Sequence, residues 1–139
     1  MTDSLRLVDR RRFLGSVAAA TALARSAHAG ARADVEATYD YKVVGDCRIK
    51  ADVYGASRDA VRPGVIWIHG GALIMGHRGG VDRALVDGLV AAGYVVVSID
   101  YRLAPEVKLP AIIEDVRDAC RWVRDRGPEL FRIERFANQ

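Results

Sequence analysis

The chain contains few of the residues that bind metals or redox cofactors. Its 139 residues include two cysteines and three histidines, and no C-x-x-C, H-E-x-x-H or clustered Cys/His pattern occurs. This predicts no metal site, and the lack of a G-x-G-x-x-G turn after a strand argues against a redox protein with a cofactor. Two thiols without close spacing do not specify a disulfide, although Cys47 and Cys120 could pair in an oxidising compartment. We expect both to be buried and unreactive.

Apart from its first 29 residues, the chain has no excess of positive or negative charge. The formal net charge is +3, but those 29 residues hold five of the 21 basic and two of the 18 acidic residues, which leaves 16 of each sign. The remainder is formally neutral, so the pI of about 9.1 does not indicate a nucleic-acid partner. The proportions of hydrophobic and charged residues are those of an ordinary globular domain.

The first 29 residues resemble a bacterial twin-arginine export signal. Arginines followed by Phe and Leu in residues 10–14 (RRRFL) precede a weakly apolar run that ends near Ala24, and residues 27–29 (AHA) form an A-x-A cleavage site. The run is too short and too rich in alanine for a membrane span, which needs about 20 residues. We therefore expect export to the periplasm or beyond and a mature start near Gly30. The alternative is an amphipathic or disordered tail.

Alternating apolar and polar residues predict an antiparallel hairpin at the start of the remaining chain. Residues 37–44 and 48–54 are rich in β-formers, and the turn signal Gly45-Asp46 separates them. Two apolar runs, residues 65–68 (VIWI) and 94–99 (YVVVSI), predict strands that are buried on both faces, and we expect the first to be central.

Helical spacing of apolar residues predicts two helices. The first spans residues 81–92 and the second spans residues 111–126, with Gly127-Pro128 ending it. Their apolar stripes are Val81, Leu85, Val86, Leu89 and Val90 in the first helix and Ile112, Val116, Ala119, Cys120 and Val123 in the second. The order of elements implies an α/β fold, in which a hairpin is followed by parallel strands with right-handed crossover helices on both faces.

A glycine turn after the first apolar strand is the main candidate for chemistry. Residues 69–72 (HGGA) come directly after Ile68, and adjacent glycines let a backbone approach a ligand closely. Open α/β sheets place their binding crevice at the carboxyl ends of the strands, and backbone N–H groups freed by such a turn can stabilise a developing negative charge. Two glycines alone are equally compatible with a plain strand-to-loop turn.

Three segments together resemble the α/β-hydrolase fold, in the esterase/lipase branch that includes hormone-sensitive-lipase-like proteins and bacterial carboxylesterases. Residues 69–72 are similar to the HGGG-type oxyanion loop of that branch. Residues 100–106 (DYRLAPE) match one of its characteristic loops, and residues 109–123 resemble the helix that follows this loop. The resemblance covers roughly residues 37–133. It implies that residues 30–139 are the N-terminal part of an α/β-hydrolase domain.

The resemblance also implies roles for the glycine turn. The backbone N–H groups of Gly71 and Ala72 would be the oxyanion-hole donors, Gly70 would permit the turn, and His69 would order the loop without acting as the catalytic base. Ala72 stands where the family often has a third glycine, so we expect its donor to survive provided that φ there stays negative.

Charged residues in and near the two loops have less specific roles. We expect Asp100 and Arg102 to tie the second loop together, with a solvated ion pair as an equal alternative. His77 and Arg78 could line a pocket rim, although plain solvent exposure is the more frequent situation.

The catalytic serine, acid and base of this fold are not found in the chain. The nucleophile of the fold lies in G-x-S-x-G and is followed by Asp or Glu and then by His. Three of the five serines lie in the predicted signal, Ser57 lies in a connector, Ser98 lies inside a strand, and the last histidine is His77. We expect the chain to stop before its nucleophile and to be inactive alone. With one sheet edge bare, we also expect poor stability in isolation.

The sequence therefore predicts the front part of an exported carboxylic-ester hydrolase. Once completed by a second chain or by a missing C-terminal half, it would act on a small-molecule ester and use no cofactor. A frameshift, an error in the gene model or a split gene would each produce such a chain. The alternative is a non-catalytic exported module, derived from a hydrolase, that binds a partner.

Overall fold

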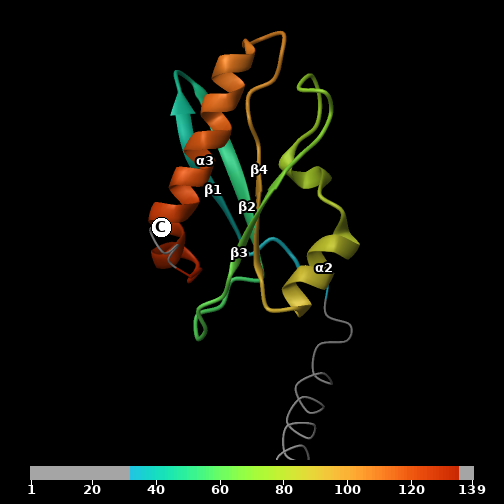
Figure 1. Ribbon diagram of the computed structural model, residues 1–139, viewed down its shortest axis with the longest axis vertical. Helices are drawn as coiled ribbons and strands as arrows, with labels where there is room; N and C mark the ends of the chain where they lie inside the picture. The colour runs from blue at the N-terminus through green and yellow to red at the C-terminus, as the bar shows by residue number, and fades with distance from the viewer. Residues whose placement is uncertain (1–31, 135–139) are drawn as a thin grey trace, which may run out of the picture. The chain divides into compact units, whose positions relative to one another are not determined.

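The computed structural model describes residues 32–134, and the predicted export signal, residues 1–29, lies outside them. In chain order the described elements are β1 (Ala37–Val44), β2 (Cys47–Tyr54), β3 (Gly64–Ile68), the 3₁₀ turn η1 (Arg78–Gly80), α2 (Arg83–Ala91), β4 (Val95–Ile99) and α3 (Leu109–Leu130) (Figure 1). Within this part of the chain, no helix is long and apolar enough to cross a membrane.

The strands form one mixed sheet in the order β1-β2-β4-β3. β1 and β2 form the predicted antiparallel hairpin, β2 also pairs antiparallel with β4, and β3 runs parallel to β4. A parallel pair needs a crossover connection, and α2 lies in the connection between β3 and β4. The predicted architecture, a hairpin followed by parallel strands as in the front part of an α/β hydrolase, is confirmed.

The central strand of the parallel pair is β4, not β3. All of β4 is buried, because β2 and β3 cover its two edges and the helices cover its two faces. The prediction of burial on both faces is wrong for β3, whose residues are only partly buried and whose Ile68 is 45% exposed. The physical reason is that β3 pairs with another described strand on one edge only.

The two helices lie on opposite faces of the sheet (Figure 1). Ala119 and Val123 of α3 pack in a buried cluster with Val97, whereas Val86 of α2 packs in a second cluster with Val96. Successive residues of a strand point to opposite faces, so neighbouring residues of β4 belong to different clusters. The predicted coverage of both faces by helices is therefore present over β4.

α3 is longer than the sequence predicts, because the helix continues through Gly127-Pro128 to Leu130. A proline in the last turn removes one helical hydrogen bond, and core packing offsets this loss. The Phe131 N–H donates to the Gly127 carbonyl at 3.0 Å, and Phe131 and Ile133 are buried. A Cβ at Gly127 would lie 2.5 Å from Cδ1 of Ile133. This glycine permits close packing and does not stop the helix.

Three residues predicted for the interior lie at the surface. Cys47 in the hairpin and Cys120 on α3 are both exposed and free, so the prediction of buried thiols is wrong. Leu85 is likewise 46% exposed. α3 is rotated about its axis relative to the predicted stripe, and a carboxylate faces the sheet. Its buried residues are Ile112, Asp115, Ala119, Val123 and Gly127.

Candidate active site

The glycine turn after β3 forms a tight loop, residues 69–76, which we call the glycine loop. The Gly71 carbonyl accepts hydrogen bonds from the backbone N–H groups of Ile74 and Met75, both at 3.1 Å. His69, at the start of the loop, is buried, whereas residues 72–76 are exposed. The loop therefore begins at a buried residue, His69, and exposes most of its remaining residues to solvent.

Glycine is required at Gly71 and Gly76. Their φ angles are +115° and +103°, and a Cβ would lie 2.1 Å from the Met75 carbonyl oxygen at the first position and 2.4 Å from the Gly70 carbonyl oxygen at the second. The prediction assigned the permissive glycine to Gly70. The structure does not support that assignment, because a Cβ at Gly70 would meet no atom within 4 Å and its φ lies outside the left-handed region.

Ala72 does not meet the expectation of a negative φ. Its φ is +53°, and Leu73 follows with +66°, a conformation that costs a residue with a side chain about 1–2 kcal/mol. No hydrogen bond found among residues 32–134 uses the N–H of Gly71, Ala72 or Leu73. These three N–H groups therefore have no hydrogen-bond partner among the described residues, and the Ala72 N–H is unpaired although the expected negative φ is wrong.

The DYRLAPE segment, which we call the second loop (residues 100–106), holds the glycine loop in place. Tyr101 stacks on His69 with ring centroids 4.1 Å apart and planes inclined by 11°, and its hydroxyl donates to the His69 carbonyl at 2.8 Å. The Ala104 N–H donates to the Leu73 carbonyl, also at 2.8 Å. His69 Nδ1 lies 2.8 Å from the Gly70 carbonyl oxygen. These contacts connect His69 and the glycine loop to the second loop.

Arg78 joins the end of the glycine loop to the sheet. Its Nε lies 2.9 Å from Asp52 on β2, and its Nη1 lies 2.6 Å from Asp100. Its backbone N–H donates to Asp100 at 2.7 Å, and its carbonyl accepts from the Ser98 hydroxyl at 2.6 Å. Asp100 therefore bonds to Arg78 and does not tie the second loop together with Arg102. Arg78 is accordingly a structural tie and not an exposed residue on a pocket rim.

The pKa of Arg78 reflects this environment. Burial by itself would lower the pKa of the guanidinium, but the hydrogen bonds to Asp52 and Asp100 outweigh burial and raise it above its ordinary value. The neighbouring His77 is exposed, and its Nδ1 accepts from the Gly79 N–H at 3.1 Å, which caps η1.

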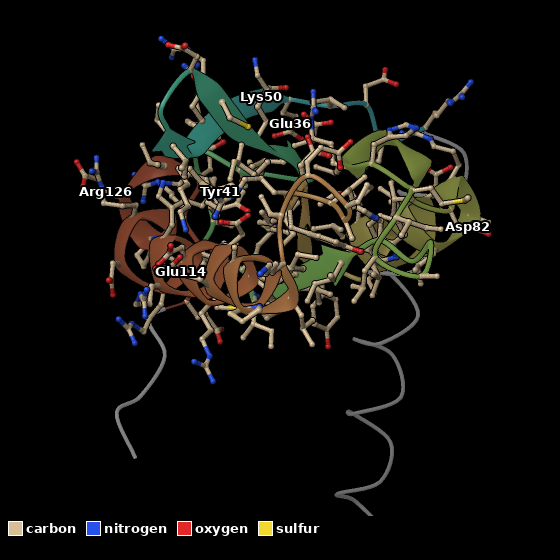
Figure 2. All side chains as sticks on the ribbon, turned by 90° about the horizontal axis from the view of Figure 1, so that it is seen from above. Glu36, Tyr41, Lys50, Asp82, Glu114 and Arg126 are labelled. Carbon is tan, nitrogen blue, oxygen red and sulfur yellow. The ribbon has the colours of Figure 1, made fainter. Side chains whose placement is uncertain are left out.

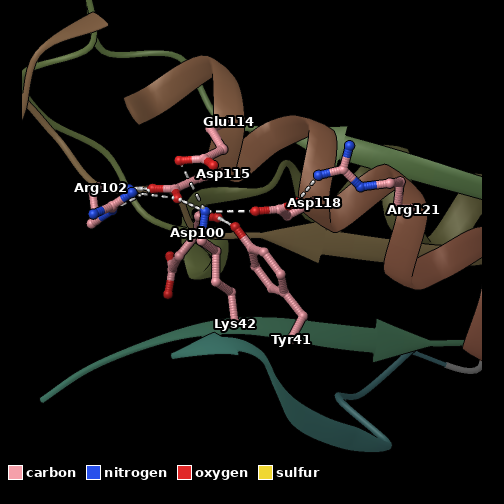
Figure 3. Close-up of polar contacts among 8 residues, drawn as sticks. All are labelled: Tyr41, Lys42, Asp100, Arg102, Glu114, Asp115, Asp118 and Arg121. Carbon is pink, nitrogen blue, oxygen red and sulfur yellow. Dashed lines mark hydrogen bonds and ion pairs between the residues drawn. The ribbon is translucent and has the colours of Figure 1, made fainter. Parts of the chain in front are cut away.

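A second ion cluster joins β1, the second loop and α3 (Figure 3). Arg102 places Nε and Nη2 each 2.8 Å from a different oxygen of Asp115. Lys42 Nζ lies 2.8 Å from Asp115 and 2.6 Å from Asp118. Burial by itself would raise the pKa of the fully buried Asp115, but the hydrogen bonds from Arg102 and Lys42 outweigh it and hold the pKa below its ordinary value.

Tyr41 adds a neutral contact to the same region. Its side chain lies between the hairpin and α3, whereas Lys50 and Arg126 point away from the core (Figure 2). The hydroxyl donates to the Asp100 carbonyl at 2.7 Å. Burial and the nearby Asp115 carboxylate raise the pKa of Tyr41, so this hydroxyl stays protonated and remains a donor.

Neither serine of the described part is placed as a nucleophile. Ser98 is fully buried and donates to the Arg78 carbonyl, and Ser57 Oγ accepts from the backbone N–H groups of Asp59 and Ala60. Among residues 32–134, no group of three or more His, Cys, Asp or Glu side chains is placed to hold a metal ion. The candidate donors of this site are the unpaired backbone N–H groups of the glycine loop.

Sequence reasoning missed three residues that hold the two loops. Tyr101 lies within the DYRLAPE motif, so the motif could have indicated that it has a role in the site. Lys42 and Asp52 lie in strands with ordinary alternation of apolar and polar residues. Only the pairing of the strands in the structure shows which residues their side chains contact. Asp52 pairs with Ser98 across the β2–β4 ladder, which brings its carboxylate to Arg78.

A comparison with known protein families shows to which family this chain is related. The BD-FAE family model matches residues 51–135, more than half of the chain. The chain belongs to the BD-FAE family. This family is α/β-hydrolase-like, and the matched range includes both the glycine loop and the second loop.

Two curated relatives each match half or more of this BD-FAE chain, but only a small part of their own length. Esterase LipI of Mycobacterium tuberculosis is 44% identical over 71 residues, which are 51% of this chain and 22% of LipI. The non-reducing polyketide synthase atr1 of Stereocaulon alpinum is 37% identical over 99 residues, which are 68% of this chain and 4% of the synthase. The chain thus spans less than a quarter of the length of either protein.

Solved structures of esterases share the fold. The thermostable carboxylesterase EstE1, from a metagenomic library, is 35% identical with a TM-score of 0.58, and the match covers 81% of this chain and 40% of EstE1. Butyrate-bound Est2 of Thermogutta terrifontis is 25% identical with a TM-score of 0.60, covering 70% of this chain and 38% of Est2. The described sheet corresponds to the N-terminal part of these esterases.

Proposed function

We propose that this chain supplies the oxyanion-binding part of a carboxylic-ester hydrolase. The supporting observation is the glycine loop, in which the N–H groups of Gly71 and Ala72 are free while Tyr101 and Ala104 hold the loop in place. Preorganised backbone donors stabilise the negative charge that develops on a carbonyl oxygen during acyl transfer. The esterase names of LipI and EstE1 support an ester as the substrate class.

The nucleophile, the base and the acid would come from residues other than those of this chain. No serine of the sequence lies in G-x-S-x-G, and no histidine follows the second loop. An oxyanion site without a nucleophile gives at most weak residual catalysis. We therefore expect no esterase turnover from this chain alone.

A chimera tests the proposal. Residues 30–139 are fused to the part of EstE1 that follows its matched region, and hydrolysis of p-nitrophenyl butyrate is measured for the chain alone and for the chimera. We expect only the chimera to be active. Gly71→Ala keeps the backbone N–H, but its Cβ would lie 2.1 Å from the Met75 carbonyl oxygen and would displace the loop that positions this donor. It should therefore lower the kcat of the chimera by about 10²–10³-fold, the usual effect of losing an oxyanion donor.

Gly70→Ala is the matched control for this experiment, because a Cβ at Gly70 meets no atom within 4 Å. Circular dichroism of both variants checks that the chimera still folds. If the folded Gly71→Ala chimera matched its parent in kcat, the glycine loop would not be the oxyanion site.

The proposal also includes export of the chain. The arginine-rich segment (residues 10–14) and the A-x-A site (residues 27–29) support export of the chain from a bacterial cytoplasm.

A non-catalytic binding module is the alternative function, and exposed apolar residues such as Leu109 and Ile113 on α3 favour it. An inactive but folded chimera would support this alternative.

A further inference from the structure

A cavity of about 430 Å³ lies at the end of the sheet opposite the glycine loop. It is lined by the start of β1, the connection between β2 and β3, and the end of α3 (Figure 1). Tyr54 at the end of β2 pairs with Val96 near the start of β4, whereas the glycine loop follows the carboxyl end of β3. The cavity is therefore separate from the proposed oxyanion site, and its volume is typical of small-molecule pockets.

Backbone hydrogen bonds hold the walls of this cavity in place. The Arg62 guanidinium donates through Nη1 to the Gly55 carbonyl at 2.8 Å, at the start of the connection between β2 and β3. The Arg62 backbone N–H donates to the Arg132 carbonyl at 3.0 Å, which joins the same connection to the end of α3. On the third side, the Glu36 N–H donates to the Val53 carbonyl at 2.9 Å. The cavity is thus formed by the fold itself.

The floor of the cavity is apolar and partly aromatic. It is lined by Tyr39, Val53, Leu130 and Phe131. Phe131 is buried, and the rings of Tyr39 and Phe131 pack with their centroids 6.0 Å apart. An aromatic or branched aliphatic group of a ligand would be removed from water on this floor, which is favourable.

Charged side chains of both signs line the rim of the cavity. Arg58, Arg132 and Glu36 are exposed, and none of the three forms an ion pair among residues 32–134. Glu129, in contrast, lies 3.8 Å from Arg126. The rim therefore offers a ligand two guanidinium groups and one carboxylate that have no partner in the described part of the chain.

Two further features favour an acceptor group on the ligand. The Ser57 hydroxyl oxygen accepts from the N–H groups of Asp59 and Ala60, both at 3.2 Å, and its proton has no acceptor among residues 32–134. Arg132 has a φ of +53°, which is uncommon for a residue with a side chain. Strained backbone of this kind clusters at ligand clamps.

We propose that this cavity binds a small zwitterion with an apolar body, the chemistry of a free apolar α-amino acid. Its carboxylate would accept hydrogen bonds from Arg58, Arg132 and Ser57, because guanidinium and hydroxyl groups are donors. Its ammonium group would pair with Glu36, and its side chain would lie on the aromatic floor. This inference goes beyond the proposed function and does not depend on it.

Titration of the full chain tests the proposal. L-Phenylalanine is the probe, and binding is measured by isothermal titration calorimetry. Two analogues each lack one charge: 3-phenylpropanoate lacks the ammonium group and phenethylamine lacks the carboxylate. We expect saturable one-to-one binding of phenylalanine and binding of each analogue that is weaker by about tenfold or more, because one charge-assisted contact is lost.

Substitutions on the rim should change this selectivity in opposite directions. Arg132→Met should weaken phenylalanine and 3-phenylpropanoate by about tenfold or more and leave phenethylamine unchanged. Glu36→Gln should weaken phenylalanine and leave 3-phenylpropanoate unchanged. Arg58→Met is a second test of the carboxylate contact. The matched control is Arg117→Met, because Arg117 is exposed on α3 and does not line the cavity. Circular dichroism confirms that each variant folds.

Amide chemical shifts locate the bound probe. We expect phenylalanine to shift the amides of Tyr39, Ala56 and Leu130 and to leave those of Gly71 and Gly76 unchanged. Absence of saturable binding, shifts confined to the glycine loop, or equal affinity for phenylalanine and 3-phenylpropanoate would each overturn the proposal. An inactive chimera would count against the proposed function alone, since phenylalanine binding requires no ester hydrolysis.

Discussion

At the scale of single residues, the shape of the glycine loop depends on two positions without a side chain. Gly71 and Gly76 both have a positive φ, and each lies against a carbonyl oxygen of the same loop. A Cβ at either position would collide with backbone, which cannot rotate away as the end of a side chain can. Gly70, although part of the motif, has neither constraint.

Alanine substitutions test this difference. Gly71→Ala and Gly76→Ala should each lower the free energy of unfolding by about 1–3 kcal/mol, because they force strain into the loop. Gly70→Ala should change it by at most about 0.5 kcal/mol. Urea unfolding followed by circular dichroism measures all three. An equal loss at all three positions would show that the loop has no specific need for glycine at Gly71 and Gly76.

At the scale of elements, the ion cluster around Asp115 connects segments that are far apart in the sequence. Lys42 comes from β1, Arg102 from the second loop and Asp115 from α3 (Figure 3). Removing one partner of a buried ion pair leaves an uncompensated charge, which is strongly destabilising. The cluster therefore couples the position of the second loop to the packing of the helix.

Asp115→Asn tests this coupling through pH. The pKa of Asp115 is lowered in the folded chain, so its contribution is present above the unfolded carboxyl pKa of about 3.9 and is lost as pH falls through the folded pKa. At pH 7 the variant should lose about 3–5 kcal/mol of unfolding free energy. Towards pH 2 the difference from the parent should shrink.

The matched control is Asp125→Asn on the same helix, whose partner Arg124 is exposed. This pair is screened by water, so its loss should change stability little at any pH. Urea unfolding at several pH values compares parent and variants. A difference between parent and Asp115→Asn that stayed constant down to pH 2 would contradict the assigned role of the carboxylate.

At the scale of the whole molecule, the proposed export concerns residues 1–29, which lie outside the described residues. We expect the exported protein to begin at Gly30, because residues 27–29 (AHA) form the A-x-A site. Changing both Arg11 and Arg12 to Lys should leave the full-length chain in the cytoplasm, because the arginine pair is the recognised feature. Arg6→Lys is the control and should leave export unchanged.

N-terminal sequencing of the periplasmic fraction measures this outcome. A start at Met1 or Thr2 in exported material would contradict cleavage of the segment. Unchanged export of the double-lysine variant would show that the arginine pair is not the signal.

The sequence by itself determined the features that depend on neighbours along the chain. Alternation and the Gly45-Asp46 turn predicted the hairpin, the run of residues 94–99 predicted buried β4, and the motifs at residues 69–72 and 100–106 indicated the family before any contact was known. These signals are local: apolar spacing and turn residues restrict the backbone within a few residues.

Only the tertiary structure decided the features that depend on contacts between distant residues. Strand order made β4 central and placed β3 at an edge of the sheet that residues 32–134 form, which no property of the segment at residues 65–68 could indicate. Core packing carried α3 past Gly127-Pro128. The packing of the loops against the sheet and α3 paired Asp100 with Arg78 and Arg102 with Asp115. In each case the arrangement was stabilised by burial or ion pairing between elements that are distant in the sequence. The residues around a single element do not show which distant residues it will contact.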